Sequence, residues 1–447
     1  MRCVLSNRKS SLAAACGAAL VFACAGGSLA QTFTIIPQLS GGTGGNTGAF
    51  IAGYGQFIVG DSDSSHTRNA DIAEGYRFDR FASPAEAGLI ATGAFSNDLF
   101  DAHATGICAD GAFVVGTSMA AVPGGIQPRA FFWSQFGGIY NIGVAGMPAG
   151  DAGSSYAYAL SGDGGTTVGA TTTATSSVLQ AFKWNGAFTV LPALPGSGPS
   201  IARAVTFNGY EIAGESAGEP FYWTNTGGAG TTNLIGPLPG APDGNGAALG
   251  LNNTGFIIVG RITSPTLSDS STGSPIPQAT AFRWTPQGIR DLGALPSTGS
   301  QSSEATGVSN NGLVIVGNSR TSGTMSDGSN EAFVWTPRSG VIPLAAKLGG
   351  ALPENVVLTS ASGISFDGLV VAGTARDSVS GKTFAYVATI PPYCVPDHNE
   401  SGVVEVQDIF DMLNDWFAGL DKADTNGNGV LEVQDIFDFL NAWFAGC

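Results

Sequence analysis

The sequence predicts a mainly β protein: a seven-bladed β-propeller followed by a small α-helical domain with two loop–helix repeats. Three observations lead to this prediction. A β-hairpin pattern of about 50 residues recurs along residues 31–390. An aromatic strand follows each hairpin. The last 54 residues then contain one 17-residue phrase twice, Val403–Gly419 and Val430–Gly446, with 14 identical positions.

The hairpins are recognised by their turns and by a terminal glycine. An Asp-Gly or Asn-Gly pair, or a close variant, supplies the positive φ angles that a tight hairpin needs. A β run then ends in glycine at positions Gly60, Gly116, Gly169, Gly214, Gly260, Gly317 and Gly373. Seven such repeats predict a ring, and the alternative architecture is a β-solenoid.

The later strands of each repeat complete the blade and predict how the ring closes. The third strand carries Ala-Phe-x-Trp or a variant, with its aromatic marker at Phe78, Trp133, Trp184, Trp223, Trp284, Trp335 and Tyr386. The next strand ends in Leu-Pro or a variant, as in Phe188–Pro192 and Ile289–Gly293. The seventh repeat stops at Ile390 without this strand, and Phe33–Pro37 has the missing pattern. We therefore expect the N-terminal strand to complete the last blade and to remove a free edge.

An N-terminal signal peptide predicts that the protein is secreted, and its net charge limits the possible partners. Residues 1–30 have the basic start, apolar run and small-residue end of a secretory signal peptide. No other stretch is long and apolar enough to span a bilayer. The net charge of −16, from 18 basic and 34 acidic residues, argues against nucleic acid as a partner.

Each C-terminal repeat begins with an oxygen-rich loop, and alternate residues of such a loop can point their oxygens inward. Ca²⁺ takes six to eight oxygens, glycine at loop position 6 permits the sharp turn, and a carboxylate at position 12 closes the shell. At positions 1, 3, 5, 7, 9 and 12 the first loop has Asp397, Asn399, Ser401, Val403, Glu405 and Asp408. The second loop has Asp424, Asn426, Asn428, Val430, Glu432 and Asp435. The sequence predicts two Ca²⁺ ions; the alternative is two acidic turns that cap helices.

An amphipathic helix follows each loop. Apolar residues recur with helical period at Ile409, Phe410, Leu413, Trp416 and Phe417, and again at Ile436, Phe437, Leu440, Trp443 and Phe444. Neither helix can bury this face alone, so we expect the two helices to pack against each other.

The cysteines that follow the signal peptide are Cys108, Cys394 and Cys447. Cys394 and Cys447 bracket the loop–helix repeats, so a disulfide that joins the two ends is expected in an oxidising compartment. The alternative is a free Cys447 kept for covalent attachment. Cys108 lies in a strand pattern and is expected to be a small buried side chain.

The arrangement loop–helix, linker, loop–helix with Asp at position 12 resembles a type I dockerin, because Pro391–Pro396 excludes the helix that precedes an ordinary EF-hand loop. The repeated VQDIF and the final Ala-Gly-Cys resemble the GC-type dockerin-like C-termini of secreted planctomycete proteins. This resemblance implies a calcium-dependent docking or anchoring module with a cohesin-like or envelope partner. It also implies partner contacts at loop positions 10 and 11, which are Val406, Gln407, Val433 and Gln434. The β repeats resemble the extracellular HAF family.

Two short motifs match hydrolase nucleophiles. Gly116–Ala120 matches the serine motif of subtilisin-like proteases, and Gly214–Gly218 matches the elbow of α/β-hydrolases. Both begin at the terminal glycine of a propeller strand, and neither His66 nor His103 has the flanking residues of a catalytic base. We therefore predict that neither serine is catalytic. The histidines lack partners at metal-ligand spacing, and the periodic tryptophans are expected in the core, with sugar stacking as the alternative.

The expected domains are a signal peptide (1–30), a propeller (31–390), a proline-rich linker (391–396) and a dockerin-like calcium module (397–447). The expected function is that of a non-enzymatic, secreted or cell-surface binding protein, with an extracellular glycan as a candidate ligand of the propeller. The alternative is an extracellular polysaccharide hydrolase. That alternative needs two carboxylates facing one sugar, and Asp101 and Glu304 are candidates that the sequence does not pair.

Overall fold

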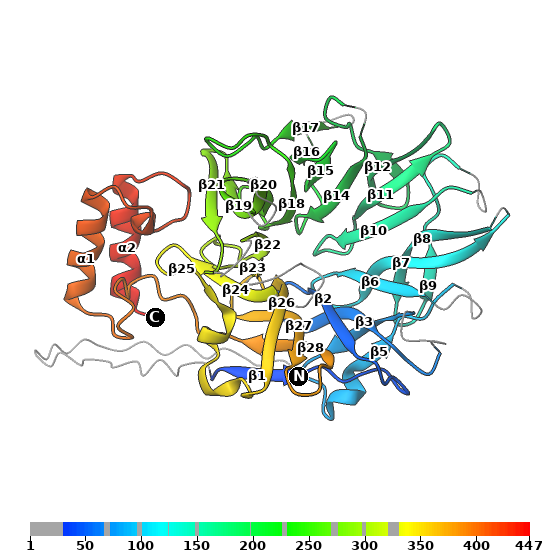
Figure 1. The fold of residues 1–447 in the computed structure, drawn as a ribbon, viewed down its shortest axis with the longest axis horizontal. Helices are drawn as coiled ribbons and strands as arrows, with labels where there is room; N and C mark the ends of the chain where they lie inside the picture. The colour runs from blue at the N-terminus through cyan, green and yellow to red at the C-terminus, as the bar shows by residue number, and fades with distance from the viewer. Residues whose placement is uncertain are drawn as a thin grey trace, which may run out of the picture.

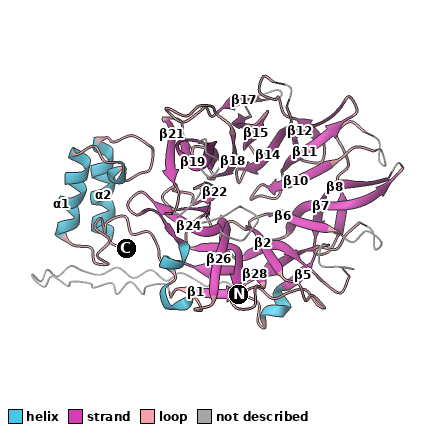
Figure 2. Ribbon diagram, in the orientation of Figure 1, coloured by secondary structure: helices cyan, strands magenta, loops and turns pink. Residues whose placement is uncertain are grey.

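The computed structural model describes residues 30–447 except 67–71, 96–100, 124, 148–151, 197, 226–229, 270–275, 297–300 and 321–329. The predicted signal peptide, apart from its last residue, lies outside the described residues. Within them, the strands form seven four-stranded antiparallel sheets arranged as a ring (Figure 1). The two α-helices lie beside the ring rather than within it (Figure 2). The predicted fold class, a seven-bladed propeller followed by a small helical region, is confirmed.

The first four blades are consecutive along the chain. They comprise β2 (Asn46–Ile51), β3 (Phe57–Ser62), β4 (Glu74–Asp79) and β5 (Leu89–Ala91); β6 (Ala102–Ile107), β7 (Phe113–Val122), β8 (Gly125–Ser134) and β9 (Gly138–Asn141); β10 (Ser155–Leu160), β11 (Thr167–Thr173), β12 (Ser176–Trp184) and β13 (Phe188–Val190); and β14 (Ser200–Val205), β15 (Glu211–Ser216), β16 (Glu219–Thr224) and β17 (Thr231–Leu234).

The remaining blades precede the helices. They comprise β18 (Gly246–Leu251), β19 (Ile258–Asp269), β20 (Ile276–Thr285) and β21 (Gly288–Gly293); β22 (Ser303–Val308), β23 (Ile315–Arg320), β24 (Asn330–Thr336) and β25 (Gly340–Pro343); and β26 (Val356–Ile364), β27 (Val370–Asp377) and β28 (Thr383–Thr389), completed by β1 (Thr32–Ile35). Short 3-10 turns are η1 (Ala85–Gly88), η2 (Leu344–Lys347), η3 (Gly349–Ala351) and η4 (Asp421–Ala423). The helices are α1 (Val406–Phe417) and α2 (Val433–Ala445).

The N-terminal strand closes the ring as the sequence predicts. Strand β1 pairs antiparallel with β28, and the Phe33 ring stacks on Tyr386 with centroids 5.5 Å apart. The next residue after β1, Ile36, is buried, and its N–H donates to the carbonyl of Ala385 at 2.9 Å. Asn46 Nδ2 donates in turn to the carbonyl of Ile36 at 3.0 Å. The last blade is therefore built from both ends of the propeller sequence.

The terminal glycines of the repeat are required by close strand approach. A Cβ built on any of them would overlap a backbone carbonyl oxygen of the preceding strand, namely that of Thr47, His103, Tyr156, Ile201, Ala247, Glu304 or Ser360. The same place in every blade has a register shift between its first two strands, for example between Ala202 and Ala204. The irregularity brings two backbones together, which excludes a side chain.

The serines of the two nucleophile motifs belong to the propeller scaffold. Ser118 lies in β7 and Ser216 in β15, each two residues after a terminal glycine, and both are buried. Ser216 Oγ accepts a hydrogen bond from the N–H of Leu194 at 3.1 Å, and Ser118 Oγ accepts one from Phe95 at 3.3 Å. Ser62 accepts the corresponding bond from Leu39. These serines therefore tie an interblade segment to its blade.

The aromatic markers align in the structure with one difference from the sequence reading. Phe131 pairs with the terminal glycine Gly116, whereas Trp133 pairs with Val114. Tyr386 pairs with the terminal glycine Gly373, so it occupies the phenylalanine position of the repeat and not the tryptophan position. The aromatic residues that pair with terminal glycines are fully buried between blades.

The C-terminal module, residues 397–447, has its own small core. Met412, Ala423 and Phe439 are buried, and Ile409, Leu413, Trp416, Leu431, Ile436 and Trp443 pack around them. The prediction that the two helices bury their apolar faces against each other is wrong in part, because Phe410, Phe417, Phe437 and Phe444 are exposed. None of the helices in the described residues is long and apolar enough to cross a membrane.

Candidate functional site

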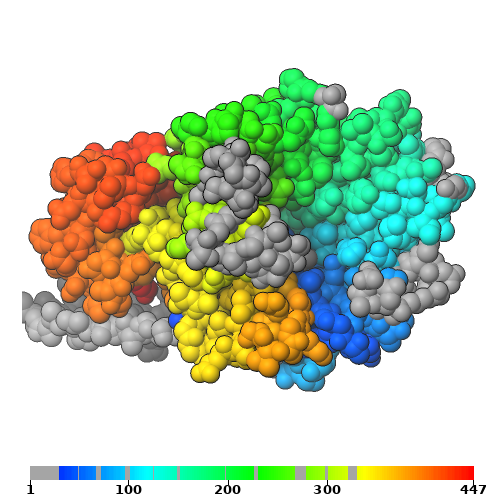
Figure 3. Space-filling view, viewed as in Figure 1, coloured from blue at the N-terminus to red at the C-terminus, as the bar shows by residue number. Residues whose placement is uncertain are grey.

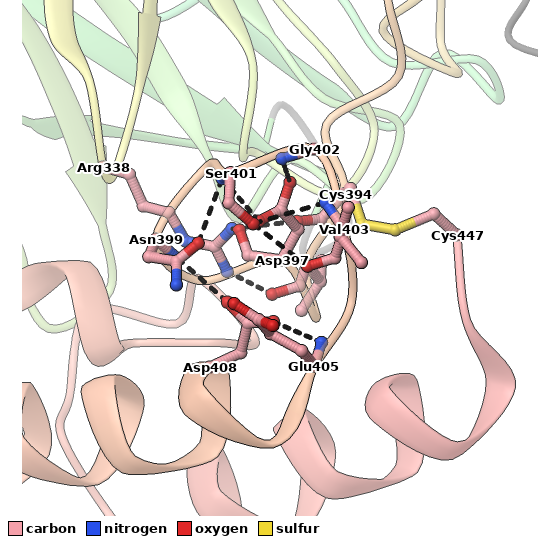
Figure 4. Close-up of a disulfide and its surroundings, with 11 residues drawn as sticks. Arg338, Cys394, Asp397, Asn399, Ser401, Gly402, Val403, Glu405, Asp408 and Cys447 are labelled. Carbon is pink, nitrogen blue, oxygen red and sulfur yellow. Dashed lines mark hydrogen bonds between the residues drawn. A yellow bond between two sulfur atoms is a disulfide. The ribbon is translucent and has the colours of Figure 1, made fainter.

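The first loop of the module wraps around the side chain of Asp397. Asp397 Oδ1 and Oδ2 accept hydrogen bonds from the N–H groups of Ser401 and Gly402, both at 2.9 Å (Figure 4). Asn399 Oδ1 accepts from the N–H of Ser401 at 3.0 Å. The side-chain oxygens of positions 1 and 3 thus lie inside a turn whose N–H groups point toward them.

The second loop repeats this geometry closely. Asp424 Oδ1 accepts from the N–H of Asn428 at 3.1 Å, and Asp424 Oδ2 accepts from that of Gly429 at 2.7 Å. Asn426 Oδ1 accepts from the N–H of Asn428 at 3.0 Å. Two different short sequences therefore fold into the same oxygen-lined turn.

The aspartates at loop position 12 close both turns from the first turn of each helix. Asp408 Oδ1 accepts from the N–H of Asn399 at 3.2 Å, and Asp435 Oδ1 accepts from that of Thr425 at 3.1 Å. Both aspartates are 0 % exposed. Burial raises the pKa of Asp435 and also that of Asp424, which faces the charge of Asp435. The second loop therefore holds two acidic side chains whose charges are poorly solvated, and in the first loop Asp397 and Asp408 are also buried.

Position 9 serves the helices as well as the loops. Glu405 and Asp408 form a capping box at the start of α1, and Glu432 and Asp435 form one at the start of α2. In the described residues, no three His, Cys, Asp or Glu side chains gather as a metal-binding group. A cation in either loop would therefore draw also on amide, hydroxyl and carbonyl oxygens, as calcium loops do.

One tryptophan on each helix connects that helix to the loop of the other repeat. Trp416 Nε1, on α1, donates to the carbonyl of Glu432 at 3.0 Å. Trp443 Nε1, on α2, donates to the carbonyl of Glu405, also at 3.0 Å. The loop ends are thereby joined by a reciprocal pair of hydrogen bonds, which the sequence reading missed although both tryptophans occupy the same place in the repeat.

The two ends of the module are joined covalently. Cys394 and Cys447 form a disulfide, with Cα atoms 5.4 Å apart (Figure 4). Cys108 is a buried free thiol between blades, and burial raises its pKa to about 11. Of the two uses considered for Cys447, the structure has the disulfide.

Loop position 2 differs between the repeats. His398 is buried, and its Nε2 lies 2.7 Å from Asp415 Oδ2 on α1, which also pairs with Lys422 at 2.7 Å. Burial lowers the pKa of His398. The imidazole edge packs against Phe439 of α2. His398 is therefore a packing residue that links the first loop to both helices.

The predicted partner positions lie at the helix starts. Val406 and Val433 are exposed, and the Gln407 and Gln434 side chains bind Asp411 and Asp438 one turn later at 2.9 and 2.8 Å. On each helix one face carries exposed apolar side chains at matching positions: Val406, Phe410 and Phe417, and Val433, Phe437 and Phe444. Phe417 and Phe444 are 77 % and 78 % exposed. This pair of helical faces is called the apolar stripes below.

Within the described residues, the cavity at the propeller axis is not acidic. The cavity where the innermost strands meet has a volume of about 80 Å³, and its lining contains no Asp, Glu or His. Asp101 lies 3.2 Å from His103, and Glu304 binds Arg261 at 3.0 Å and Asn318 at 3.1 Å. The structure thus places these two carboxylates in separate polar clusters, on blades 2 and 6.

Three arginines of the propeller contact the module, and the sequence reading missed them. Arg338 donates to the carbonyls of Cys394, Val395 and Asp397. Arg283 and Arg290 contact the second loop. These contacts join residues more than 50 positions apart, so local sequence patterns do not predict them. The sign available in the sequence that the two loops have different surroundings was loop position 4, which is Glu400 in the first loop and Gly427 in the second.

No family model and no curated protein sequence matches the chain. Solved structures with a similar fold include the β-propeller domain of the Trilobed protease from Pyrococcus furiosus, at 7% identity, with 76% of this chain and 95% of that chain covered and a TM-score of 0.43. Kuenenia stuttgartiensis hydrazine synthase matches at 11% identity, with 75% and 93% covered and a TM-score of 0.41. The GH74 enzyme of Niastella koreensis matches at 14% identity, with 78% and 43% covered and a TM-score of 0.42.

Proposed function

We propose that the protein is a secreted or cell-surface binding protein whose C-terminal module binds two Ca²⁺ ions and docks to an anchoring partner. The observation that carries this proposal is the repeated loop geometry. Asp397 and Asp424 occupy the same position in the same oxygen-lined turn, each facing a buried aspartate at position 12. Helix capping uses Glu405 with Asp408 and Glu432 with Asp435, so it does not account for Asp397 and Asp424 in the same oxygen-lined turn.

The residues fit a hard cation. In the first loop the ion would be held by Asp397, Asn399, Ser401, the carbonyl of Val403, Glu405 and Asp408; in the second loop by Asp424, Asn426, Asn428, the carbonyl of Val430, Glu432 and Asp435. A bound ion supplies the positive charge that two buried aspartates in one loop otherwise lack. Without it, their mutual repulsion and poor solvation oppose the folded loop.

The apolar stripes support docking as the role of the module. Exposed phenylalanines at matching places on two helices form a surface that a soluble monomer has little reason to keep. The dockerin-like sequence pattern favours a cohesin-like or envelope protein as the occupant. The propeller would then be the part presented to the surroundings, with an extracellular glycan as a candidate ligand.

The calcium claim is tested by calorimetric titration of the chain from residue 31 with Ca²⁺. We expect two bound ions, and one in each of the variants Asp397→Ala and Asp424→Ala. Asp163→Ala, in a propeller turn, is the matched control and should leave two. Heat changes unaffected by either loop substitution would contradict the proposal.

The docking claim is tested by binding of the purified protein to cell-envelope fractions with Ca²⁺ or with a chelator. Binding should require Ca²⁺ and should fall at least tenfold in Phe410→Asp/Phe437→Asp, because two charges would enter the buried face. Phe136→Asp, an exposed propeller residue, is the control. Equal binding by both variants would contradict docking through the stripes.

A further inference from the structure

The second loop of the module is in contact with the propeller. Arg283 of β20 donates to the carbonyl of Gly427 and is 4 % exposed. Arg290 of β21 donates to the carbonyl of Gly429 at 2.9 Å and pairs with Asp421 at 2.7 Å. Figure 3 shows the orange and red atoms of the module against the yellow-green atoms of blades 5 and 6. The propeller thus holds this loop through its backbone.

At loop position 4 the second loop packs closely against the propeller. A Cβ at Gly427 would lie 3.1 Å from Leu313 Cδ2 and 3.3 Å from the carbonyl oxygen of Asn311, both on blade 6. The first loop has Glu400 at this position with φ of 56°, beside a cavity of about 230 Å³. The loop conformation itself therefore accepts a side chain at position 4, and in the second loop the propeller surface leaves only tight room for one.

Loop position 6 shows the same asymmetry. A Cβ at Gly429 would lie 2.9 Å from Thr285 Oγ1 at the end of β20. At Gly402, the same position in the first loop, no atom lies within 4 Å. Both glycines serve the turn, but only Gly429 is also pressed against the propeller. The two loops, which share one geometry, therefore have different surroundings.

The interface and the cation site use one backbone conformation. The N–H groups of Asn428 and Gly429 point to Asp424, while the carbonyls of Gly427 and Gly429 point to the arginines. An ion that orders this turn would therefore order the surface that the propeller binds.

We propose that cation binding in the second loop and seating of the module on blades 5 and 6 are thermodynamically coupled through the fitted positions Gly427 and Gly429. The first loop contacts the propeller through Arg338, which donates to the carbonyl of Asp397, but it has no such fit at loop positions 4 and 6. This inference rests on the proposed calcium binding. Coupling is reciprocal, so the seated propeller raises the cation affinity of the second loop by the same factor by which the cation favours seating.

Charge repulsion between the arginines and the cation acts in the opposite direction. Two features limit it. Both arginines contact backbone carbonyls outside the ligand set, so they leave the ligand oxygens free. The charge of Arg290 is also paired with Asp421. We therefore expect preorganisation of the loop to be the larger effect, so that the propeller contacts strengthen Ca²⁺ binding by the second loop.

The experiment uses the chain from residue 31 in two backgrounds: Asp397→Ala, in which only the second loop titrates, and Asp424→Ala, in which only the first does. Gly427→Asn tests the fitted position, since Asn tolerates a positive φ, and Glu400→Asn is its counterpart in the first loop. Arg290→Gln removes a contact without backbone strain, and Arg261→Gln, which loses an ion pair with Glu304 within the propeller, is its control.

We expect Gly427→Asn and Arg290→Gln to weaken Ca²⁺ binding by the second loop about tenfold, within the usual range of coupling between sites. Glu400→Asn should change the Ca²⁺ affinity of the first loop less than threefold, and Arg261→Gln should change that of the second loop less than threefold. Small-angle scattering should show a larger radius of gyration when the module leaves the propeller, in chelator or in Gly427→Asn.

Unchanged or tighter Ca²⁺ binding in both second-loop variants would overturn the coupling, as would a radius of gyration that is independent of Ca²⁺. These results leave the first-loop titration intact and so do not affect the proposed function. If neither background binds Ca²⁺, the proposed function fails and the inference fails with it.

Discussion

Removal of the Cys394–Cys447 disulfide should destabilise the module and leave the propeller folded. The cross-link joins residues 53 positions apart, enclosing both loops and both helices. A closed segment of this length restricts the unfolded chain by about 4 kcal/mol at 25 °C. The module has only three buried apolar side chains in its core cluster, so this amount is comparable with its total stability.

Hydrogen exchange followed by mass spectrometry measures the effect locally. In Cys394→Ala/Cys447→Ala, the slowest amides of α1 and α2 should exchange up to about a thousandfold faster, the ratio that corresponds to 4 kcal/mol. Amides of the innermost propeller strands should be unchanged. Cys108→Ala, which removes a buried thiol between blades, is the control and should leave α1 and α2 protected. A change of less than threefold in the helices of the double variant would refute the argument.

Three further predictions concern the propeller. Ile36→Ala should lower the free energy of unfolding by about 3 kcal/mol in a denaturant titration, because Ile36 anchors the closing strand in the core; a loss below about 1 kcal/mol would contradict that role. Gly214→Ala should cost about 3 kcal/mol by the same measurement, since its Cβ would overlap the carbonyl of Ile201, whereas Gly350→Ala, in open space, should be near neutral. The hydrogen bond that His103 Nδ1 donates to Asp61 raises the pKa of His103, so this pair stabilises the fold below the unfolded pKa of about 6.5 and the effect is lost as pH rises through the folded pKa. Because the side chain is 47 % exposed, the contribution should be below about 1 kcal/mol, and NMR titration should find a lower His103 pKa in Asp61→Asn.

The propeller was predictable because its signals are local and repeated. Each Asx-Gly turn needs a positive φ, and Gly111, Gly164 and Gly368 have values of 70°, 74° and 75°. Each terminal glycine is required because a Cβ at that position would overlap a backbone carbonyl oxygen of the neighbouring strand, and this contact recurs in every blade. The unpaired strand pattern at Phe33–Pro37 was sufficient to predict ring closure, since a seventh blade without a fourth strand would leave an open edge.

The errors arose where tertiary packing decides between neighbouring residues. Tyr386 was aligned with the tryptophans because both are aromatic, but only the pairing with Gly373 shows which position it fills. In the module, helical periodicity marked Phe410 and Phe437 as buried, whereas the small core is centred on Met412 and Phe439. Helical periodicity gives the average direction of a face, and the crossing of two short helices decides which residues of that face are covered.

The contacts of the second loop could not be predicted from its own sequence. Arg283 and Arg290 precede Gly427 and Gly429 by 144 and 139 positions. The difference between Glu400 and Gly427 in otherwise similar repeats was visible in the sequence, whereas the surface of blade 6 that lies against Gly427 was not. A difference between internal repeats is therefore evidence of unequal surroundings before those surroundings are known.

The closing strand also determines the order in which the protein can be assembled. Thr32 and Thr389, which hydrogen-bond across the last blade, are separated by 357 positions. Strand β1 therefore has no partner until β28 has been synthesised. Six blades can form from neighbouring segments while the seventh waits, and the ring becomes continuous only in the last step. A cleavage that removes part of residues 31–37 would therefore act on that last step, leaving six complete blades and a seventh blade without its fourth strand.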